Sequence, residues 1–412
     1  MIRVVITGMG AITPCGQTVA ALWENIKEGR IGIDYITRFS TDDFKVKVAA
    51  EVKGFQADTY MERRETKRMD LYSQYAIAAA VDAVAASGLS ESDLRGNERA
   101  GVIIGAGIGG LATMEEQVTR LNEKGPSRVG PLFIPTTIAN MAAGNVAVRF
   151  GTNGICTSVV TACAAGANCI GEAFHRIKHG YEDVILTGGA EAAITRIGMA
   201  GFQALTALSE SNDPARASIP FDKDRDGFVM GEGAGVLVLE SLEHAAKRGA
   251  TIYAEIVGYG TTCDAYHMTS PNPEGAGAAM AMKQAVREAG IEAAAVSYIN
   301  AHGTSTPPND LPETVAIKTV FGEAAYNIPV SSTKSMTGHM LGAAGAVEAI
   351  ICIEALRNGF VPPTAGLLTP EEGCDLNYVP QKGYAADLQY ALSNSFGFGG
   401  HNAVLCFQKW GE

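Results

Sequence analysis

Ala164-Ala-Gly-Ala167 and Ala343-Ala-Gly-Ala346 decide the fold, because the same stretch of small residues occurs in each half of the chain. Each copy lies thirteen residues before a glycine, Gly180 in the first case and Gly359 in the second. Helices rich in alanine and glycine can lie very close to each other or between two sheets. We therefore expect a duplicated chain in a five-layered αβαβα arrangement, with these two helices buried in the middle.

The rest of the chain alternates short β-branched runs with alanine-rich helical stretches, which is typical of an α/β fold with buried sheets. The runs form two series, 3–8, 101–105 and 183–188, then 253–257, 296–300, 328–331 and 390–393. A helical stretch at 241–248 separates the two series. We therefore predict an N-terminal half of residues 1–250 and a C-terminal half of residues 251–412.

The composition is that of a compact globular protein, since 47% of the 412 residues are hydrophobic and 18% are charged. No run reaches the roughly 18 apolar residues that a membrane span needs, and the first apolar run is too short for a signal peptide. We therefore expect a cytoplasmic protein whose eight cysteines are reduced thiols, buried as small hydrophobic side chains. The formal charge of −12 argues against nucleic-acid binding, which requires a positive surface.

Cys163 differs from the other cysteines in its surroundings. It follows the strand-like run 159–161 and precedes the helix that begins with the first alanine stretch. A thiol at a helix N-terminus faces unpaired N–H groups and the positive end of the helix dipole, which can lower its pKa to roughly 3.5–7.5. The sequence therefore predicts a nucleophilic thiolate at Cys163, and we expect the other seven cysteines to be inert.

Two histidines follow in positions suited to the same site. His302 comes just after the predicted strand 296–300, and α/β folds assemble active sites at the carboxyl ends of strands. His339 precedes the second alanine stretch, at the start of the helix that mirrors the Cys163 helix. The dipole and burial there disfavour the imidazolium, so we expect His339 to be neutral and to donate from Nε2.

With Cys163, His302 and His339 in place, the chain resembles the elongating type II β-ketoacyl-acyl-carrier-protein synthases, which are condensing enzymes with a thiolase-like fold. The resemblance extends from the opening strand to Gly399-Gly-His-Asn402. Initiating condensing enzymes use Cys-His-Asn, and thiolases bring a second cysteine. The resemblance implies fatty-acid elongation by decarboxylative Claisen condensation of malonyl-acyl-carrier protein with an acyl-enzyme thioester.

The resemblance also implies a role for each residue of the set. Cys163 takes the acyl group from acyl carrier protein, and backbone N–H groups of Cys163 and Phe398 hold the oxyanion. His302 and His339 stabilise the enolate that forms when malonyl loses carbon dioxide. Phe398, with a glycine on each side, resembles the phenylalanine that gates the site in this family.

Further positions match residues that support the site or bind the substrate in the family. Lys334 and Glu348 match a pair that orders the pocket, and Glu313 is expected to support the loop at His302. The positions that match substrate-binding residues are Thr304 and Thr306, for the phosphopantetheine arm, and Ile108 and Phe202, for the acyl pocket.

Acyl carrier protein is acidic, so it requires a local basic patch on this acidic chain. The densest basic run is 63–68. The residues that we expect to dock the carrier protein are Arg63, Arg64, Lys67, Arg68, Lys124 and Arg128. The resemblance also implies a homodimer.

The implied reaction requires no metal or redox cofactor, because decarboxylation drives it. The family nevertheless has a site for a monovalent cation, sodium or potassium, built largely from backbone oxygens. The positions that match this site are Asn300, Ala301, Glu348, Ser393 and Asn394.

Other functions stay open on the sequence alone. A type II polyketide ketosynthase and a type I β-ketoacyl synthase share the motifs, although the length of the chain and the residues within the motifs favour type II fatty-acid elongation. A cysteine hydrolase would resolve the acyl-enzyme with water, and a non-catalytic acyl-binding protein would not need the nucleophile. Gly105-Ala-Gly107-Ile-Gly-Gly110 fits the fingerprint of a nicotinamide-dependent oxidoreductase, but no clear acidic residue closes a second strand about 20 residues on.

Overall fold

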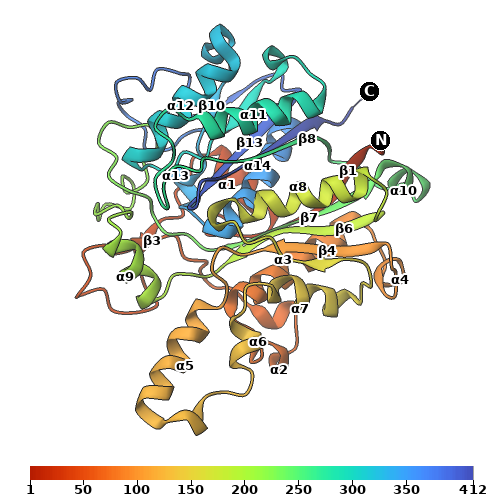
Figure 1. The fold of residues 1–412 in the computed structure, drawn as a ribbon, viewed down its shortest axis with the longest axis vertical. Coiled ribbons are helices and arrows are strands. Elements are labelled where there is room, and N and C mark those ends of the chain that lie inside the picture. The colour runs from red at the N-terminus through yellow and green to blue at the C-terminus, as the bar shows by residue number, and fades with distance from the viewer. Residues whose placement is uncertain (412) are drawn as a thin grey trace.

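Ten strands form one hydrogen-bonded sheet in the computed structural model, which describes residues 1–411 (Figure 1). In sheet order they are β10 (Val330–Ser331), β9 (Tyr298–Asn300), β13 (Tyr390–Gly397), β14 (His401–Lys409), β8 (Ala254–Cys263), β1 (Val4–Ile12), β7 (Gly233–Ser241), β6 (Val184–Glu191), β4 (Ala100–Gly105) and β5 (Cys156–Thr157). The remaining described strands pair in two small sheets, β2 (Asp34–Tyr35) with β3 (Val48–Ala49) and β11 (Phe360–Val361) with β12 (Tyr384–Ala385).

The large sheet repeats one topology twice. From the centre outward, the first half runs β1-β7-β6-β4-β5 and the second runs β8-β14-β13-β9-β10. In each half, the large-sheet strands at these positions come first, fifth, fourth, second and third along the chain. The halves join where β1 pairs with β8 over three residues, Val4–Ile6 against Ala254–Ile256. The predicted duplication is therefore confirmed. The predicted boundary at residues 250 and 251 falls in the connection between α10 (Leu242–Lys247) and β8.

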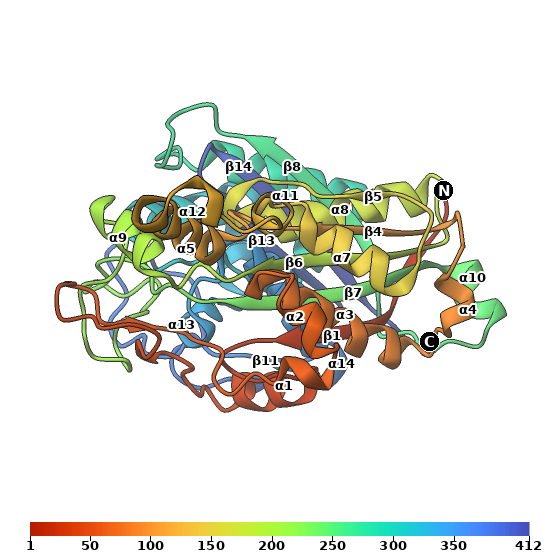
Figure 2. The ribbon, with the colours of Figure 1, turned by 90° about the horizontal axis from the view of Figure 1, so that it is seen from below.

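Helices lie in three layers around the two halves of the sheet, as Figures 1 and 2 show. The central layer is α8 (Ala165–Lys178) and α14 (Ala344–Asn358), which contact each other and both halves of the sheet. The outer helices are α3 (Leu71–Ser87) and α7 (Met141–Phe150) on the first half, and α11 (Ala276–Ala289) and α12 (Pro307–Phe321) on the second. The predicted five-layered arrangement is therefore confirmed.

Glycine at the two alanine stretches allows the central helices to touch. A Cβ atom at Gly166 would lie 2.8 Å from the carbonyl oxygen of Gly342, and one at Gly345 would lie 2.9 Å from the backbone nitrogen of Ala167. Real Cβ atoms do not come so close to backbone atoms, so larger residues would push the two helices apart. The small residues of the two stretches therefore set the separation between the halves.

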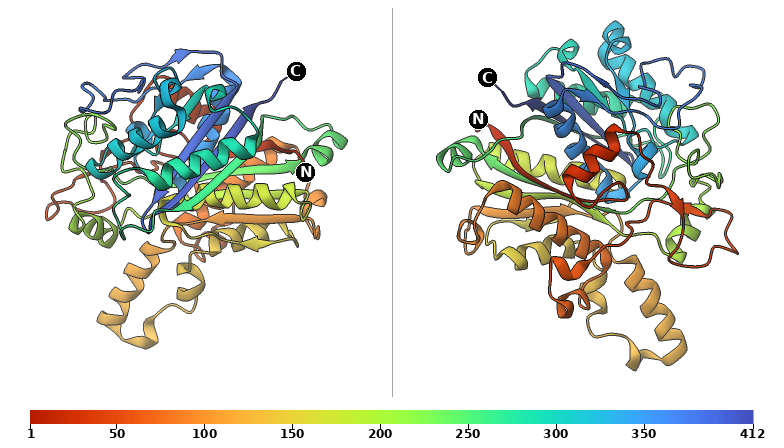
Figure 3. Two further views of the ribbon diagram at one scale, coloured as in Figure 1. Left: turned by 45° about the horizontal axis from the view of Figure 1, so that its top comes forward. Right: turned by 180° about the vertical axis from the view of Figure 1, so that it is seen from behind.

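The other helices lie at the edges and ends of these layers, and Figure 3 shows α5 projecting from the body. They are α1 (Val19–Lys27), α2 (Arg63–Thr66), α4 (Glu91–Leu94), α5 (Leu111–Lys124), α6 (Phe133–Thr137), α9 (Arg196–Ala204) and α13 (Lys334–Thr337). No helix within residues 1–411 is long and apolar enough to cross a membrane.

Two local expectations are wrong. The run 159–161 is not a strand, because β5 ends at Thr157 and the chain then leaves the edge of the sheet to reach Cys163. All eight cysteines are free, as expected, but Cys156 and Cys263 are exposed, one in the edge strand and one at the end of β8. The strands β5, β7 and β14 of the large sheet, and the four strands of the two small sheets, are additions to the predicted set.

Candidate active site

Cys163 lies in a tight turn that opens α8. The 3-10 turn Ala162–Ala164 precedes the helix, and Ala162 has a φ of 50°, in the left-handed region that a residue with a Cβ rarely adopts. The end of β13 packs against this turn, since a Cβ atom at Gly397 would lie 3.1 Å from the backbone nitrogen of Cys163. The backbone N–H groups of Cys163 and Phe398 both favour the thiolate form of the sulfur. They therefore face the reacting atom, where an oxyanion would also develop.

His302 is held by a buried carboxylate. It follows β9, and its backbone N–H donates to Glu313 of α12 at 2.8 Å, as does the N–H of Gly303. The side-chain amide of Asn394, in β13, donates to the same carboxylate at 3.0 Å. The prediction that Glu313 supports this loop is therefore confirmed.

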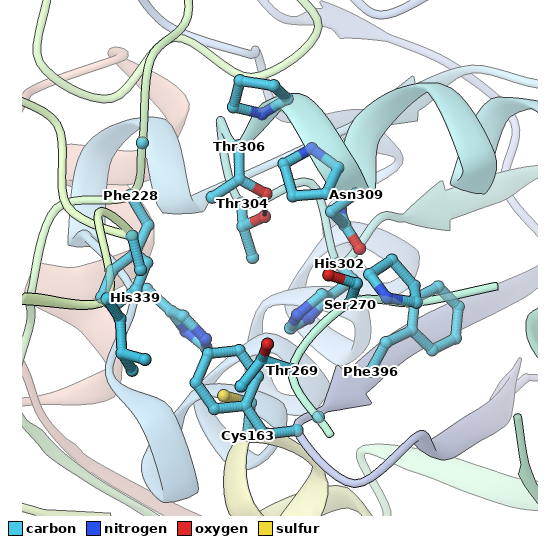
Figure 4. A pocket seen from close by; sticks show the side chains of 18 of the residues that line it. Cys163, Phe228, Thr269, Ser270, His302, Thr304, Thr306, Asn309, His339 and Phe396 are labelled. Carbon is cyan, nitrogen blue, oxygen red and sulfur yellow. Dashed lines mark hydrogen bonds between the residues drawn. The ribbon is translucent and has the colours of Figure 1, made fainter. Parts of the chain in front are cut away.

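His339 faces His302 across the site. Its backbone N–H donates to the carbonyl oxygen of Val229 at 2.7 Å, just before the 3-10 turn Leu341–Ala343 that opens α14. The two imidazole rings lie 5.3 Å apart between centroids, at an interplanar angle of 85°. Figure 4 shows both rings turned toward each other and toward the sulfur of Cys163. The Nδ1 atoms of both rings are buried without a hydrogen-bond partner, so packing orients the rings.

A buried lysine sets the charge of the site. Lys334 is 1% exposed and forms an ion pair with Glu348 of α14, which is 2% exposed. Burial and the positive charge of Lys334 hold the pKa of His302 and of His339 well below the usual value. Both imidazoles are therefore neutral at pH 7, as predicted for His339, and each carries one N–H to donate.

The thiol of Cys163 is protonated in the free protein. Burial raises its pKa to about 12, and the nearby charge of Lys334 opposes this shift without cancelling it. The prediction of a thiolate with a lowered pKa is therefore wrong, because the helix that presents Cys163 also buries it to 8% exposure. The proton has to leave the sulfur during the reaction.

A cavity of about 340 Å³ joins these residues. Its lining includes Cys163, His302, His339, Phe202, Thr304, Thr306 and Phe398. The hydroxyl groups of Thr304 and Thr306 lie 2.8 Å apart, and the rings of Phe202 and Phe398 lie 6.3 Å apart between centroids. Ile108 lies outside this cavity and is 38% exposed. Its place in the acyl pocket stays a prediction.

The six predicted docking residues lie outside the cavity, on the surface. All six are exposed: Arg63, Arg64, Lys67, Arg68, Lys124 and Arg128. They belong to α2 and its end, to the last residue of α5 and to the short turn Pro126–Arg128. Arg64 pairs with Glu62 at 2.7 Å.

Four of the five predicted cation-site residues have buried oxygen atoms without a hydrogen-bond partner within residues 1–411. They are Asn300 Oδ1, Glu348 Oε2, Ser393 Oγ and Asn394 Oδ1, and Ser395 Oγ shares this property. Buried polar atoms are rarely left unpaired. Oxygen atoms are the donors that hard cations prefer, so these residues fit a small cation.

The glycine-rich loop 105–110 encloses a side chain that the sequence did not reveal as functional. Glu191, at the end of β6, accepts hydrogen bonds from the backbone N–H groups of Gly107, Ile108 and Gly109 at 2.7, 3.3 and 3.2 Å. A pyrophosphate would need these same N–H groups. The dinucleotide interpretation is therefore wrong.

The pH dependence of alkylation at Cys163 tests the state of the thiol. Only the thiolate reacts, so the rate with iodoacetamide should rise about tenfold per pH unit from about pH 6 to about pH 10. Mass spectrometry of the Cys163 peptide separates this reaction from that of the exposed cysteines. A rate that levels off below about pH 8 would contradict the raised pKa.

Comparisons with known proteins agree with this geometry. Residues 1–245 match the model of the beta-ketoacyl synthase N-terminal domain, and residues 253–368 match that of the beta-ketoacyl synthase C-terminal domain. Two proteins called 3-oxoacyl-[acyl-carrier-protein] synthase 2, from Synechocystis and from Staphylococcus aureus MRSA252, are each 53% identical to this chain over 99% of its length. The alignments cover 98% and 99% of those proteins.

A solved structure gives the same fold. It is described as a type II polyketide synthase acyl carrier protein in complex with its ketosynthase bound to the hexaketide. The TM-score is 0.92 with 36% sequence identity, and the alignment covers 100% of both chains. The predicted thiolase-like fold is therefore confirmed. The family models, the curated relatives and the site geometry lead to one conclusion: the chain belongs to the beta-ketoacyl synthase family.

Proposed function

We propose that this chain elongates fatty acids as a 3-oxoacyl-[acyl-carrier-protein] synthase. The observation that carries the proposal is the convergence of one thiol, Cys163, and two neutral imidazoles, His302 and His339, on a single cavity. Covalent capture of an acyl group needs the thiol, and stabilisation of an enolate needs uncharged N–H donors. The relatives at 53% identity carry the name of this activity.

The first half reaction transfers the acyl group to the enzyme. Cys163 attacks the thioester carbonyl, a new sulfur–carbon bond forms, and the thioester bond to the carrier breaks. The N–H groups of Cys163 and Phe398 face the sulfur and hold the oxyanion while both bonds are partly formed. The proton of the Cys163 thiol leaves with the phosphopantetheine thiol, so no net charge is created in the buried cavity.

The second half reaction makes the new carbon–carbon bond. The bond from malonyl to its carboxylate breaks, carbon dioxide departs, and the electron pair moves to the thioester oxygen as an enolate. His302 and His339 donate to that oxygen as neutral groups. The enolate carbon then attacks the acyl carbonyl and expels the Cys163 thiolate, which takes up a proton from solvent. The product is a 3-oxoacyl thioester, two carbons longer, on the carrier.

The loops at the cavity support a gate at Phe398. The N–H of Gly399 donates to the carbonyl oxygen of Met268 at 2.8 Å, and the N–H of Asp264 donates to that of Gly400 at 2.9 Å. Gly399 and Gly400 have φ angles of 87° and 76°, which favour glycine. A movement of Phe398 would therefore involve the segment from Asp264 to Met268.

Mass spectrometry tests the proposed function directly. Incubation with acyl-carrier proteins of several chain lengths should add an acyl mass to the Cys163 peptide, and malonyl-carrier protein should then remove it as a 3-oxoacyl product. The variant Cys163→Ala should lose acyl transfer but keep malonyl decarboxylation, because His302 and His339 are intact. Clearance of the adduct by water alone would indicate a hydrolase instead.

A type II polyketide ketosynthase is the second candidate within the family. The ketosynthase complex with acyl carrier protein is 36% identical to this chain, against 53% for the fatty-acid-type relatives. Repeated extension of an unreduced 3-oxo product in the same assay would favour the polyketide activity.

We infer that the basic residues of α2 and of the segment just after it dock acyl carrier protein. Lys67 and Arg68 are exposed, and the carrier protein is acidic. The double variant Lys67→Glu, Arg68→Glu should raise KM for carrier-bound substrate at least about tenfold, while KM for a small pantetheine thioester stays unchanged. Equal effects on both substrates would contradict docking at this surface.

We infer that sodium or potassium binds the cation site. Burial raises the pKa of Glu348 to about 7 against the opposing charge of Lys334, and the nearby Glu313 adds to this rise, so two carboxyl groups act on each other in a buried place. A cation among the unpaired oxygens would relieve this repulsion. The Tm should then be higher in sodium or potassium chloride than in choline chloride at equal ionic strength, and Ser393→Ala should reduce the difference. Equal Tm values in all three salts would exclude the site.

The assembly and location of the protein are further proposals. The edge strand β5 leaves backbone groups unpaired. Val148 of α7, which contacts β5, is 80% exposed, and Val160, which follows β5 in the chain, is 54% exposed. A second copy of this chain would cover these side chains, so we propose a homodimer. Sedimentation equilibrium checks it, and a monomer at micromolar concentration would contradict it. Cell fractionation checks the predicted cytoplasmic location.

A further inference from the structure

Glu191 is a buried carboxyl group that backbone N–H groups alone satisfy. It is 0% exposed, and no lysine, arginine or histidine within residues 1–411 lies in salt-bridge distance of it. Besides the three hydrogen bonds from Gly107, Ile108 and Gly109, it accepts a fourth hydrogen bond from the backbone N–H of Gly342 at 3.1 Å. The three donors of the loop belong to the first half of the chain, and Gly342 belongs to the second.

The four hydrogen bonds join the loop 107–109, which packs against the turn of Cys163, to the turn that follows His339. A Cβ atom at Gly107 would lie 3.4 Å from the carbonyl oxygen of Ala162, the residue before Cys163. Gly342 belongs to the turn that follows His339, and a Cβ atom there would lie 2.2 Å from the backbone nitrogen of Gly107. The two segments are therefore in contact, and Glu191 is bonded to both.

The duplication gives Gly342 a special position. The turns Ala162–Ala164 and Leu341–Ala343 open the two central helices, and each begins with a residue at positive φ, 50° at Ala162 and 46° at Leu341. Aligned on these turns, Gly342 takes the place of Cys163. In the first half, the backbone N–H at this position belongs to Cys163 and faces the reacting sulfur. In the second half, it belongs to Gly342 and donates to Glu191.

We propose that Glu191 is a positioning residue for condensation, because it fixes the turn that carries Cys163 relative to the turn that follows His339. This role rests on the proposed function. The transfer of the acyl group uses Cys163, and the decarboxylation uses the histidines. The carbon–carbon bond forms only when the acyl carbonyl and the enolate lie at the right distance, so this step depends on the relative position of the two turns.

The variant Glu191→Gln keeps the shape of the side chain but replaces one acceptor oxygen with an amide that cannot accept. Gly107 and Gly342 both donate to Oε2, and Ile108 and Gly109 both donate to Oε1, so an amide nitrogen at either position turns a donor toward two backbone N–H groups. Single-turnover condensation of the pre-acylated enzyme with malonyl-carrier protein should slow by about 10- to 100-fold, the range expected from a displacement near 1 Å. Acylation of Cys163 without malonyl, and decarboxylation in the Cys163→Ala background, should each change less than about threefold.

Glu240→Gln is the matched control, because Glu240 is also 0% exposed near the end of a strand, where it binds Thr7, His244 and Arg248. It should lower the Tm without a selective loss of condensation. If Glu191→Gln does not fold, Glu191→Asp is judged by the same three rates. The proposal is overturned if condensation stays within about twofold of the parent or if all three rates fall equally. A parent enzyme that cannot condense would instead refute the proposed function.

Discussion

The contact between the two central helices is the constraint on which the rest of the structure depends. Gly166 meets Gly342 and Gly345 meets Ala167 with no space for a side chain between them. Since α8 begins after Cys163 and α14 begins after His339, this contact also brings the nucleophile and one imidazole into the same site. Three residue pairs between β1 and β8 also join the halves. Packing of small residues therefore determines the geometry of the chemistry.

Burial gives the site its charge state. The interior favours uncharged forms, so the thiol keeps its proton and both imidazoles stay neutral. Lys334 is the cation that acts on all three groups, and its ion pair with Glu348 keeps that charge in place. Breaking such a buried pair costs about 3–5 kcal/mol, because one charge is left uncompensated. Stability and reactivity therefore depend on the same pair.

The sequence predicted the duplication, the layers and the three central residues because repeats, strand ends and glycine-rich turns are local patterns. It failed where the outcome depends on three-dimensional environment. The pKa of Cys163 follows from how deeply its helix is buried. The helix dipole, which the sequence does indicate, carries no information about that burial. Glu191 occupies the glycine-rich loop from a strand more than 80 residues away. The only sign of this role in the sequence is that Glu191 is an acidic residue at the end of an apolar strand.

The shared cavity has a consequence for the timing of the reaction. The thiol and both imidazoles open onto one space lined by Thr304 and Thr306, so the loaded carriers have to visit in succession. Between the two visits the enzyme holds a reactive ester that water must not reach. In the proposed reaction, Phe398 and Phe202 at the wall of this space shield an intermediate as well as admit a substrate. Extension of the chain then requires that this thioester outlast the interval between the two visits.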